Sequence, residues 1–138
     1  MPEKHRSSIS NVLETQNHPQ CGEIWMCSLP YKSGSVQSGY RPVFILSNDV
    51  NNLHSSTLNI IPITSKMRKR NLPVHVELLD HSRYGLESPS IMLIEQIMTV
   101  SKSELDYKVG AILDCRVLQN IQRAIAVQFP IVRFSAES

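Results

Sequence analysis

The sequence predicts a mainly β fold, a small and strongly bent barrel with added helices, including one near the C-terminus. Short apolar segments recur between turn-forming residues, segment 73–79 alternates apolar and polar side chains, and a helical period begins only after Asp114. The chain has 138 residues, which is enough for one domain with its own core and too few for two ordinary domains.

The first two strands are expected at 23–29 and 41–47. Pro30 ends the first strand, and a loop rich in Ser and Gly, 31–40, leads to the second. Because 41–47 is almost continuously apolar, we expect a central strand that is covered on both faces. A polar turn or a single helical turn follows at 48–56.

The remaining strands follow in the middle of the chain. Segment 57–64 is rich in β-branched residues, and Pro62 within it indicates an edge strand or a bulge. The alternation over 73–79 is typical of a strand with one face in solvent. Two further apolar segments, 90–94 and 95–100, complete a set of five or six short strands.

Helical signals are confined to the last third of the chain. Ser101 and Glu104 have the spacing of a capping box, which predicts a helical turn. Asp114 is expected to cap a longer helix, which Pro130 ends. The residues expected to share one face of this helix are Val117, Leu118, Ile121, Ala124, Ile125 and Gln128.

Composition, 41% hydrophobic and 19% charged, indicates a globular protein, and the cysteines favour a reducing compartment. Cys21, Cys27 and Cys115 are odd in number and lack the spacing of a disulfide framework or a zinc site. Residues 1–20 are expected to form a mobile polar leader without the apolar run of a signal peptide, and 21–138 a single domain. No segment has membrane-spanning length, so we expect a cytoplasmic protein that does not bind membranes.

Segment 34–49 carries the first functional signal. A Gly- and Ser-rich loop runs into Arg41 at the start of an apolar strand, and a cation beside backbone amides is suited to holding a phosphate. Thr64 ends a second apolar strand, so its hydroxyl can bind the same phosphate as Arg41. The basic run 66–70 follows Thr64 and can attract a polyanion electrostatically. Each feature also has a purely structural alternative. Arg41 can be a strand-edge charge paired with a carboxylate, Thr64 can bond its hydroxyl to the backbone, and 66–70 can be a solvated loop.

Further candidates lie in the loops and at a strand end. Glu95 and Gln96 stand where an apolar strand gives way, so the carboxylate can serve as a general acid or base and the amide can read base edges. Tyr31 can stack on RNA bases, although tyrosines are common in surface loops. His75 is expected on the solvent face of its strand rather than in catalysis.

Four blocks of the sequence resemble one family in the same order and at similar spacing. The blocks are GSVQSGYRPVFILSND at 34–49, PITS at 62–65, LPVHVE at 72–77 and LIEQIMT at 93–99. They are similar to the blocks of the MazF/PemK (Kid) toxins of bacterial toxin–antitoxin systems. The similarity covers roughly residues 22 to 128.

The resemblance implies a small SH3-like barrel of the CcdB/PemK type that acts as a homodimer. It implies a sequence-specific endoribonuclease that cleaves single-stranded RNA without metal or other cofactor and is held inactive by an acidic antitoxin. The family's catalytic arginine, threonine and acidic residue fall on Arg41, Thr64 and Glu95. Together with the two loops, the resemblance gives as RNA-binding candidates Tyr31, Ser35, Gln37, Ser65, Lys66, Arg68, Lys69, Arg70 and Gln96.

Two positions depart from the family pattern. Val36 replaces the glutamate of the first block, and Ser38 replaces a glycine. Two other functions stay open. The CcdB toxins share this barrel architecture but bind topoisomerase without catalysis, and Val36 favours an RNA-binding module that has lost catalysis.

Overall fold

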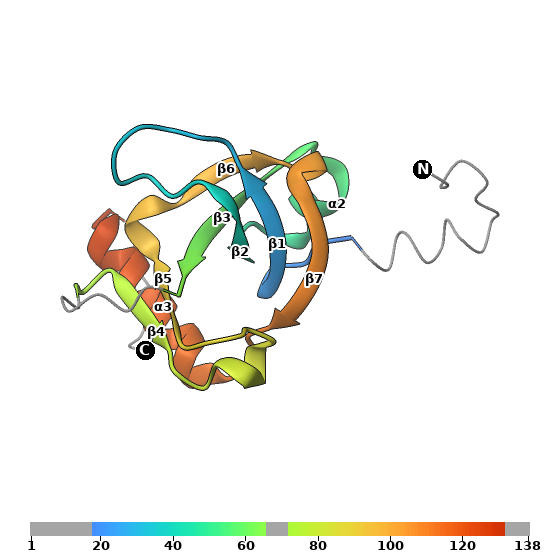
Figure 1. Ribbon diagram of the computed structural model, residues 1–138. Coiled ribbons are helices and arrows are strands. Elements are labelled where there is room, and N and C mark those ends of the chain that lie inside the picture. The colour runs from blue at the N-terminus through green and yellow to red at the C-terminus, as the bar shows by residue number, and fades with distance from the viewer. Residues whose placement is uncertain (1–17, 66–71, 132–138) are drawn as a thin grey trace.

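Seven antiparallel strands form one curved sheet in the computed structural model, which describes residues 18–65 and 72–131 (Figure 1). The strand order is β4-β5-β3-β2-β1-β7, and β6 pairs with β3 beside this path. The strands are β1 Glu23–Leu29, β2 Gly39–Ile45, β3 Thr57–Thr64, β4 His75–Leu78, β5 Ser90–Leu93, β6 Met98–Ser101 and β7 Leu105–Ala111. The α-helices are α2 Asp49–His54 and α3 Cys115–Gln128, and the 3-10 turns are η2 His81–Tyr84, η3 Ile94–Gln96 and η4 Lys102–Glu104.

Residues 1–17 of the predicted leader lie outside the described residues. Pro19 is buried, and the backbone N–H of Gln20 donates to the carboxylate of Glu23 at 2.9 Å. The described chain therefore contacts the domain from Pro19 onward.

β2 lies inside the sheet, between β3 and β1, as its apolar sequence predicts. Its residues alternate between two separate cores: Phe44 packs in one, while Val43 and Ile45 pack in the other. All three side chains are buried. The expectation that β2 is covered on both faces is confirmed.

β3 is a central strand, so the edge position expected from Pro62 is wrong. On one side β3 pairs with β2, where Pro62 lies opposite Val43. On the other side Thr57–Ile60 pair with β6, and Ile63 and Thr64 pair with β5. Pro62 falls between these two partners, where that side of β3 has no paired residue, so a residue without an N–H is tolerated there.

β7 is the strand that the sequence did not reveal, because it lacks both an apolar run and a regular alternation. Its sequence, LDYKVGA, contains no fully buried side chain. Among the described strands β7 pairs with β1 alone, through an irregular register, and lies at an edge of the sheet. The expected helical turn before it is confirmed as η4, where Ser101 accepts a hydrogen bond from the N–H of Ser103 at 3.3 Å.

The sheet does not close by strand pairing between its two edges, β4 and β7, in the described part of the chain. The segment after η2 crosses β7 instead. A Cβ added to Gly85 would lie 2.2 Å from the carbonyl oxygen of Val109, and one added to Gly110 would lie 2.2 Å from that of Tyr84. Two backbones therefore touch where only glycine fits, and this contact joins the two edges.

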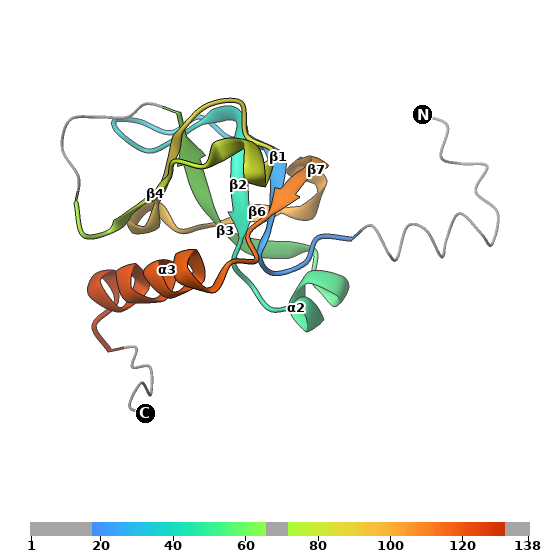
Figure 2. The ribbon, with the colours of Figure 1, turned by 90° about the horizontal axis from the view of Figure 1, so that it is seen from below.

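Helix α3 lies along one side of the sheet, close to β4 (Figure 2). Ile121 and Ala124 are buried, and Val117, Leu118 and Ile125 pack against the same core, so the predicted apolar face is confirmed. The cap is different from the one expected. Asp114 holds the N-cap position, but its carboxylate accepts a hydrogen bond from the hydroxyl of Tyr84 at 2.9 Å instead of capping the helix.

Candidate active site

Five side chains from four strands reach one face of the sheet because side chains alternate along a strand. They are Arg41 of β2, Thr64 of β3, His75 of β4, and Ile91 and Leu93 of β5. Thr64 lies opposite Ile91, and His75 lies opposite Leu93. The β2–β3 register, continued by two residues beyond Val43 and Pro62, brings Arg41 opposite Thr64. These residues line a pocket of about 520 Å³ together with Gly34, Ser35, Val36, Gln37, Ser38, Ser65, Glu95 and Gln96.

Arg41 is a partly buried cation in this pocket. Its Nε donates to the carbonyl oxygen of Ser38 at 2.9 Å, and no carboxylate of the described chain lies within ion-pair distance of it. Burial lowers the pKa of Arg41, yet a guanidinium keeps its charge in proteins. The alternative of a strand-edge charge paired with a carboxylate therefore does not describe Arg41, whose terminal nitrogens can bind an anion.

Thr64 ends β3 and is 8% exposed. Its position in the pocket wall beside Arg41 places a hydroxyl and a guanidinium on the same surface. These two groups are the ones that the sequence selects as a phosphate-binding pair.

Glu95 lies on η3 and contacts a histidine that the sequence does not mark as functional. Nε2 of His75 and Oε2 of Glu95 are 3.1 Å apart, and their side chains are 11% and 29% exposed. The expectation that His75 faces solvent is wrong. The alternation along β4 is as predicted, with Val76 buried, but the face that carries His75 forms the pocket wall. Only the pairing of β4 with β5 reveals this, since one strand's alternation does not say what covers each face.

Gln96 holds the loop that forms the pocket's outer wall. Its Oε1 accepts from the N–H of Gln37 at 2.8 Å, and its Nε2 donates to the carbonyl oxygen of Ser35 at 3.1 Å. Both halves of the amide that we expected to read bases are thus bonded to loop backbone. Ser35 and Gln37, both RNA-binding candidates, line the pocket.

Val36 stands in the same loop, is 39% exposed and lines the pocket. An apolar side chain here brings no charge toward Arg41. The pocket wall contributed by this loop is therefore uncharged in the described chain.

The other candidates are distributed unevenly. Ser65 and Arg41 also line a neighbouring pocket of about 650 Å³, which Tyr40 and Tyr107 border. Tyr31 is 82% exposed and does not line the pocket of Arg41. Lys66, Arg68, Lys69 and Arg70 lie outside the described residues.

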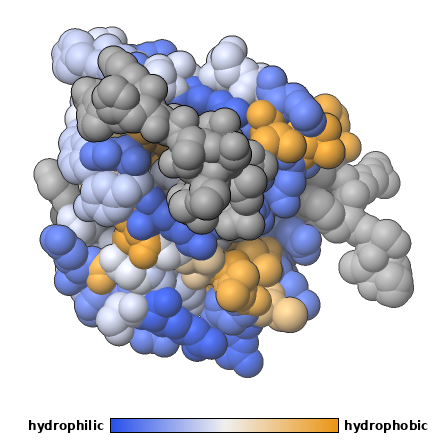
Figure 3. Space-filling model, turned by 90° about the vertical axis from the view of Figure 1, so that its right-hand side faces the viewer, coloured by the Kyte–Doolittle hydropathy of each residue, from blue (hydrophilic) through white to orange (hydrophobic). Residues whose placement is uncertain are grey.

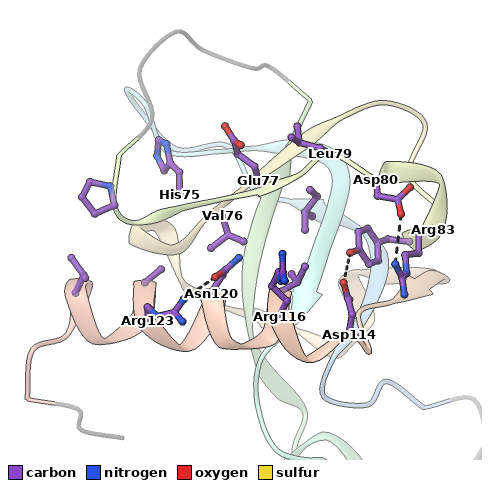
Figure 4. Close-up of a pocket in the computed structure, with 16 residues that line it drawn as sticks. His75, Val76, Glu77, Leu79, Asp80, Arg83, Asp114, Arg116, Asn120 and Arg123 are labelled. Atoms are coloured by element: carbon purple, nitrogen blue, oxygen red, sulfur yellow. Dashed lines mark hydrogen bonds and ion pairs between the residues drawn. The ribbon is translucent and has the colours of Figure 1, made fainter. Parts of the chain in front are cut away.

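A larger pocket, about 830 Å³, lies between β4 and α3 (Figure 4). Arg116, Asn120 and Arg123 project into it from α3, and Val76 points toward it from β4. It contains neither Arg41 nor Thr64, although His75 borders both pockets. We therefore place the candidate active site in the smaller pocket.

Metal-ligand clusters and membrane-spanning helices are absent from the described ranges. No three His, Cys, Asp or Glu residues there gather to hold a metal ion, and no helix there is both long and apolar enough to cross a membrane. All three cysteines are free thiols. On the face seen in Figure 3, the visible hydrophobic residues form separate groups among hydrophilic ones.

Comparison with known proteins identifies relatives along most of the chain. Endoribonuclease EndoA of Bacillus subtilis is 35% identical over 113 residues, 82% of this chain and 96% of that protein. Endoribonuclease MazF of Staphylococcus saprophyticus is 35% identical over 106 residues, 77% of this chain and 87% of its own length.

Solved structures with similar folds include a toxin and an endoribonuclease. The toxin MazF-mt6 of Mycobacterium tuberculosis has a TM-score of 0.65 at 24% identity, covering 78% of this chain and 96% of that one. A mycobacterial endoribonuclease in complex with its cognate antitoxin has a TM-score of 0.65 at 22% identity, with 84% and 99% covered. The family described as the PemK-like, MazF-like toxin of type II toxin–antitoxin systems matches residues 20–129. The chain belongs to this PemK/MazF toxin family.

Proposed function

We propose that this protein is the toxin of a type II toxin–antitoxin system and cleaves single-stranded RNA at specific sequences. The products are a 2′,3′-cyclic phosphate and a 5′-hydroxyl, and the reaction needs no metal. The observation that carries the proposal is the gathering of Arg41, Thr64 and Glu95 in one pocket of a PemK/MazF family chain.

The reaction begins when the 2′-hydroxyl attacks the adjacent phosphorus. Glu95 takes the proton of this hydroxyl, and the 5′-oxygen takes up a proton from water as it leaves. Arg41 lies against the non-bridging oxygens, where negative charge develops in the transition state. Thr64 donates a hydrogen bond to the same phosphate and keeps the attacking and leaving oxygens in line.

RNA recognition belongs to the loops around this pocket. Ser35, Gln37 and Ser65 line it and are placed to contact the nucleotides that flank the scissile phosphate. The basic run 66–70 adds affinity for the RNA backbone, with the salt dependence of any polyanion contact, and Tyr31 stacks on a base farther along the strand. DNA is inert because it lacks the 2′-hydroxyl that attacks.

An acidic antitoxin and a second copy of the chain are the proposed protein partners, in the cytoplasm. The cationic pocket that holds RNA phosphates can also hold a peptide rich in Asp and Glu, which blocks cleavage. Self-association is supported by exposed apolar residues near the end of α3: Val127 is 55% exposed, Phe129 39% and Ile131 91%.

The test is primer extension on a long RNA that has been incubated with the protein, with and without a metal chelator. We expect discrete cleavage sites that survive chelation, and a rate about 10²- to 10³-fold lower in Arg41→Ala because one phosphate donor is lost. Arg83→Ala is the matched control, since Arg83 is an exposed arginine that pairs with Asp80 at 3.7 Å.

Full activity of folded Arg41→Ala, or strict dependence on added magnesium, contradicts the proposed mechanism. Absence of cleavage together with trapped topoisomerase complexes identifies the protein as a topoisomerase-binding toxin. RNA binding without turnover identifies it as a binding module.

A further inference from the structure

The geometry points to His75 as a positioning residue for Glu95, an inference that rests on the proposed function. His75 donates its Nε2–H to Oε2 of Glu95 and so holds this carboxylate in the wall that Arg41 and Thr64 share. None of the catalytic positions that the family resemblance transfers falls on this histidine.

The direction of the hydrogen bond follows from the chemistry of the two groups. Nε2 and Oε2 are 3.1 Å apart, and an ionised carboxylate can only accept. The proton of this bond therefore sits on Nε2 of His75. The ring holds the carboxylate in place, as hydrogen bonds from neighbouring residues hold catalytic groups in many active sites.

This bond is the one polar contact that fixes the pair within the described chain. Nδ1 of His75 and Oε1 of Glu95 are both buried and have no hydrogen-bond partner there. Without the ring, neither oxygen of Glu95 has a donor among the described residues, and the carboxylate can rotate away from its place beside the substrate.

The backbone around His75 is itself well held. The N–H of His75 donates to the carbonyl oxygen of Leu72 at 2.9 Å, and the N–H of Ile94, beside Glu95, donates to that of Val74 at 3.0 Å. Figure 4 shows His75 on the side of β4 away from α3, whereas Val76 points toward the helix. β4 therefore presents the ring to the active-site pocket on a fixed support.

The first test compares RNA cleavage by His75→Ala and His75→Gln, with His54→Ala as the control. His54 is exposed at the end of α2 and lines no part of the pocket. We expect kcat to fall by about 10- to 100-fold in His75→Ala, which is the effect of losing a hydrogen bond to a charged group, while KM stays within about threefold. His75→Gln recovers most of kcat because its amide can donate to Glu95, and His54→Ala is unchanged.

Two results overturn the role. A wild-type kcat in folded His75→Ala would show that the reaction does not need the ring. Equal loss of kcat in His75→Gln and His75→Ala means that proton transfer by the ring, rather than donation to Glu95, is what the reaction uses.

The second test does not depend on activity. In weakly alkaline buffer, where an ordinary histidine ring is neutral, nitrogen NMR of the wild-type protein should show His75 protonated at Nε2. The signal should change in Glu95→Gln and stay the same in Glu77→Gln, whose carboxylate is exposed on the same strand. A ring protonated only at Nδ1 overturns the inference. If the wild type cuts no RNA but shows the Nε2–H signal, the proposed function fails while the His75–Glu95 bond stands.

Discussion

Arg41 is the residue on which the proposed chemistry depends most. A cation that is partly buried without a carboxylate partner costs free energy, so the fold must support it in other ways. The carbonyl oxygen of Ser38 satisfies one donor, and the backbone of Arg41 pairs with Cys27 of β1. Because Val36 adds no carboxylate to the loop, the full charge of Arg41 is available to a phosphate.

The three thiols differ in their surroundings, and this predicts an order of reactivity. Burial raises the pKa of Cys27 to about 11, whereas Cys21 and Cys115 are exposed. Although Cys21 is exposed as a residue, partial burial of its thiol and the nearby Asp49 raise its pKa. Since the thiolate is the reactive form, we expect iodoacetamide near pH 8 to modify Cys115 first, Cys21 more slowly and Cys27 only after unfolding.

Mass spectrometry of the alkylated native protein, with denatured protein as the control, gives this order.

The burial of Cys27 also has a consequence for stability. A thiol with a raised pKa in the folded state stabilises that state most below the ordinary value of 9.0, and this contribution is lost as pH rises through about 11. Rapid modification of Cys27 in the native protein would contradict its buried position.

At the scale of elements, the loop between β1 and β2 is positioned by a 3-10 turn that lies far along the chain. Gln96, on η3, bonds the backbone at Gln37 and Ser35, which are 59 and 61 residues away. A loop held at two points keeps its shape before the substrate arrives, so it loses less conformational entropy when the substrate binds.

Gln96→Ala removes both of these bonds and should loosen the loop. At about 1 kcal/mol each, their loss predicts a rise in KM of about 3- to 30-fold, with a smaller change in kcat. Hydrogen exchange should show faster exchange of the N–H of Gln37. Gln119→Ala, an exposed change on α3, is the control. Unchanged exchange at Gln37 would show that Gln96 does not hold the loop.

At the scale of the whole molecule, a backbone crossing links the two edges of the sheet. Gly85 ends η2 with φ of +81°, and it meets β7 next to Gly110. Nearby, Tyr84 bonds Asp114 at the start of α3, so the turn, the edge strand and the helix meet at one place. This junction keeps β4, and with it His75, in a fixed place relative to β1 and β2.

Gly85→Ala tests the importance of the junction. The left-handed backbone and the contact with Val109 together predict a loss of about 2–5 kcal/mol in the free energy of unfolding. Gly39→Ala is the control, since Gly39 has φ of +85° but no atom within 4 Å of the added Cβ, and should lose only about 1–2 kcal/mol. Urea unfolding measures both, and equal losses would show that the crossing adds nothing.

The sequence alone predicts most elements because their signals are local. The apolar run of β2, the alternation of β4 and the helical face of α3 each depend on neighbouring residues, and the four ordered blocks indicate the family in the same way. β7 is missed because an edge strand with one partner needs neither an apolar run nor a strict alternation.

The tertiary structure decided what those signals cannot contain. Pro62 is typical of an edge strand, yet β3 is central because it changes partners at that proline. The pattern around His75 is typical of a solvent-facing residue, yet the pairing of β4 with β5 turns it toward Glu95. Both outcomes depend on contacts between residues far apart in the chain, and these are set by strand pairing, which a single strand's pattern does not specify.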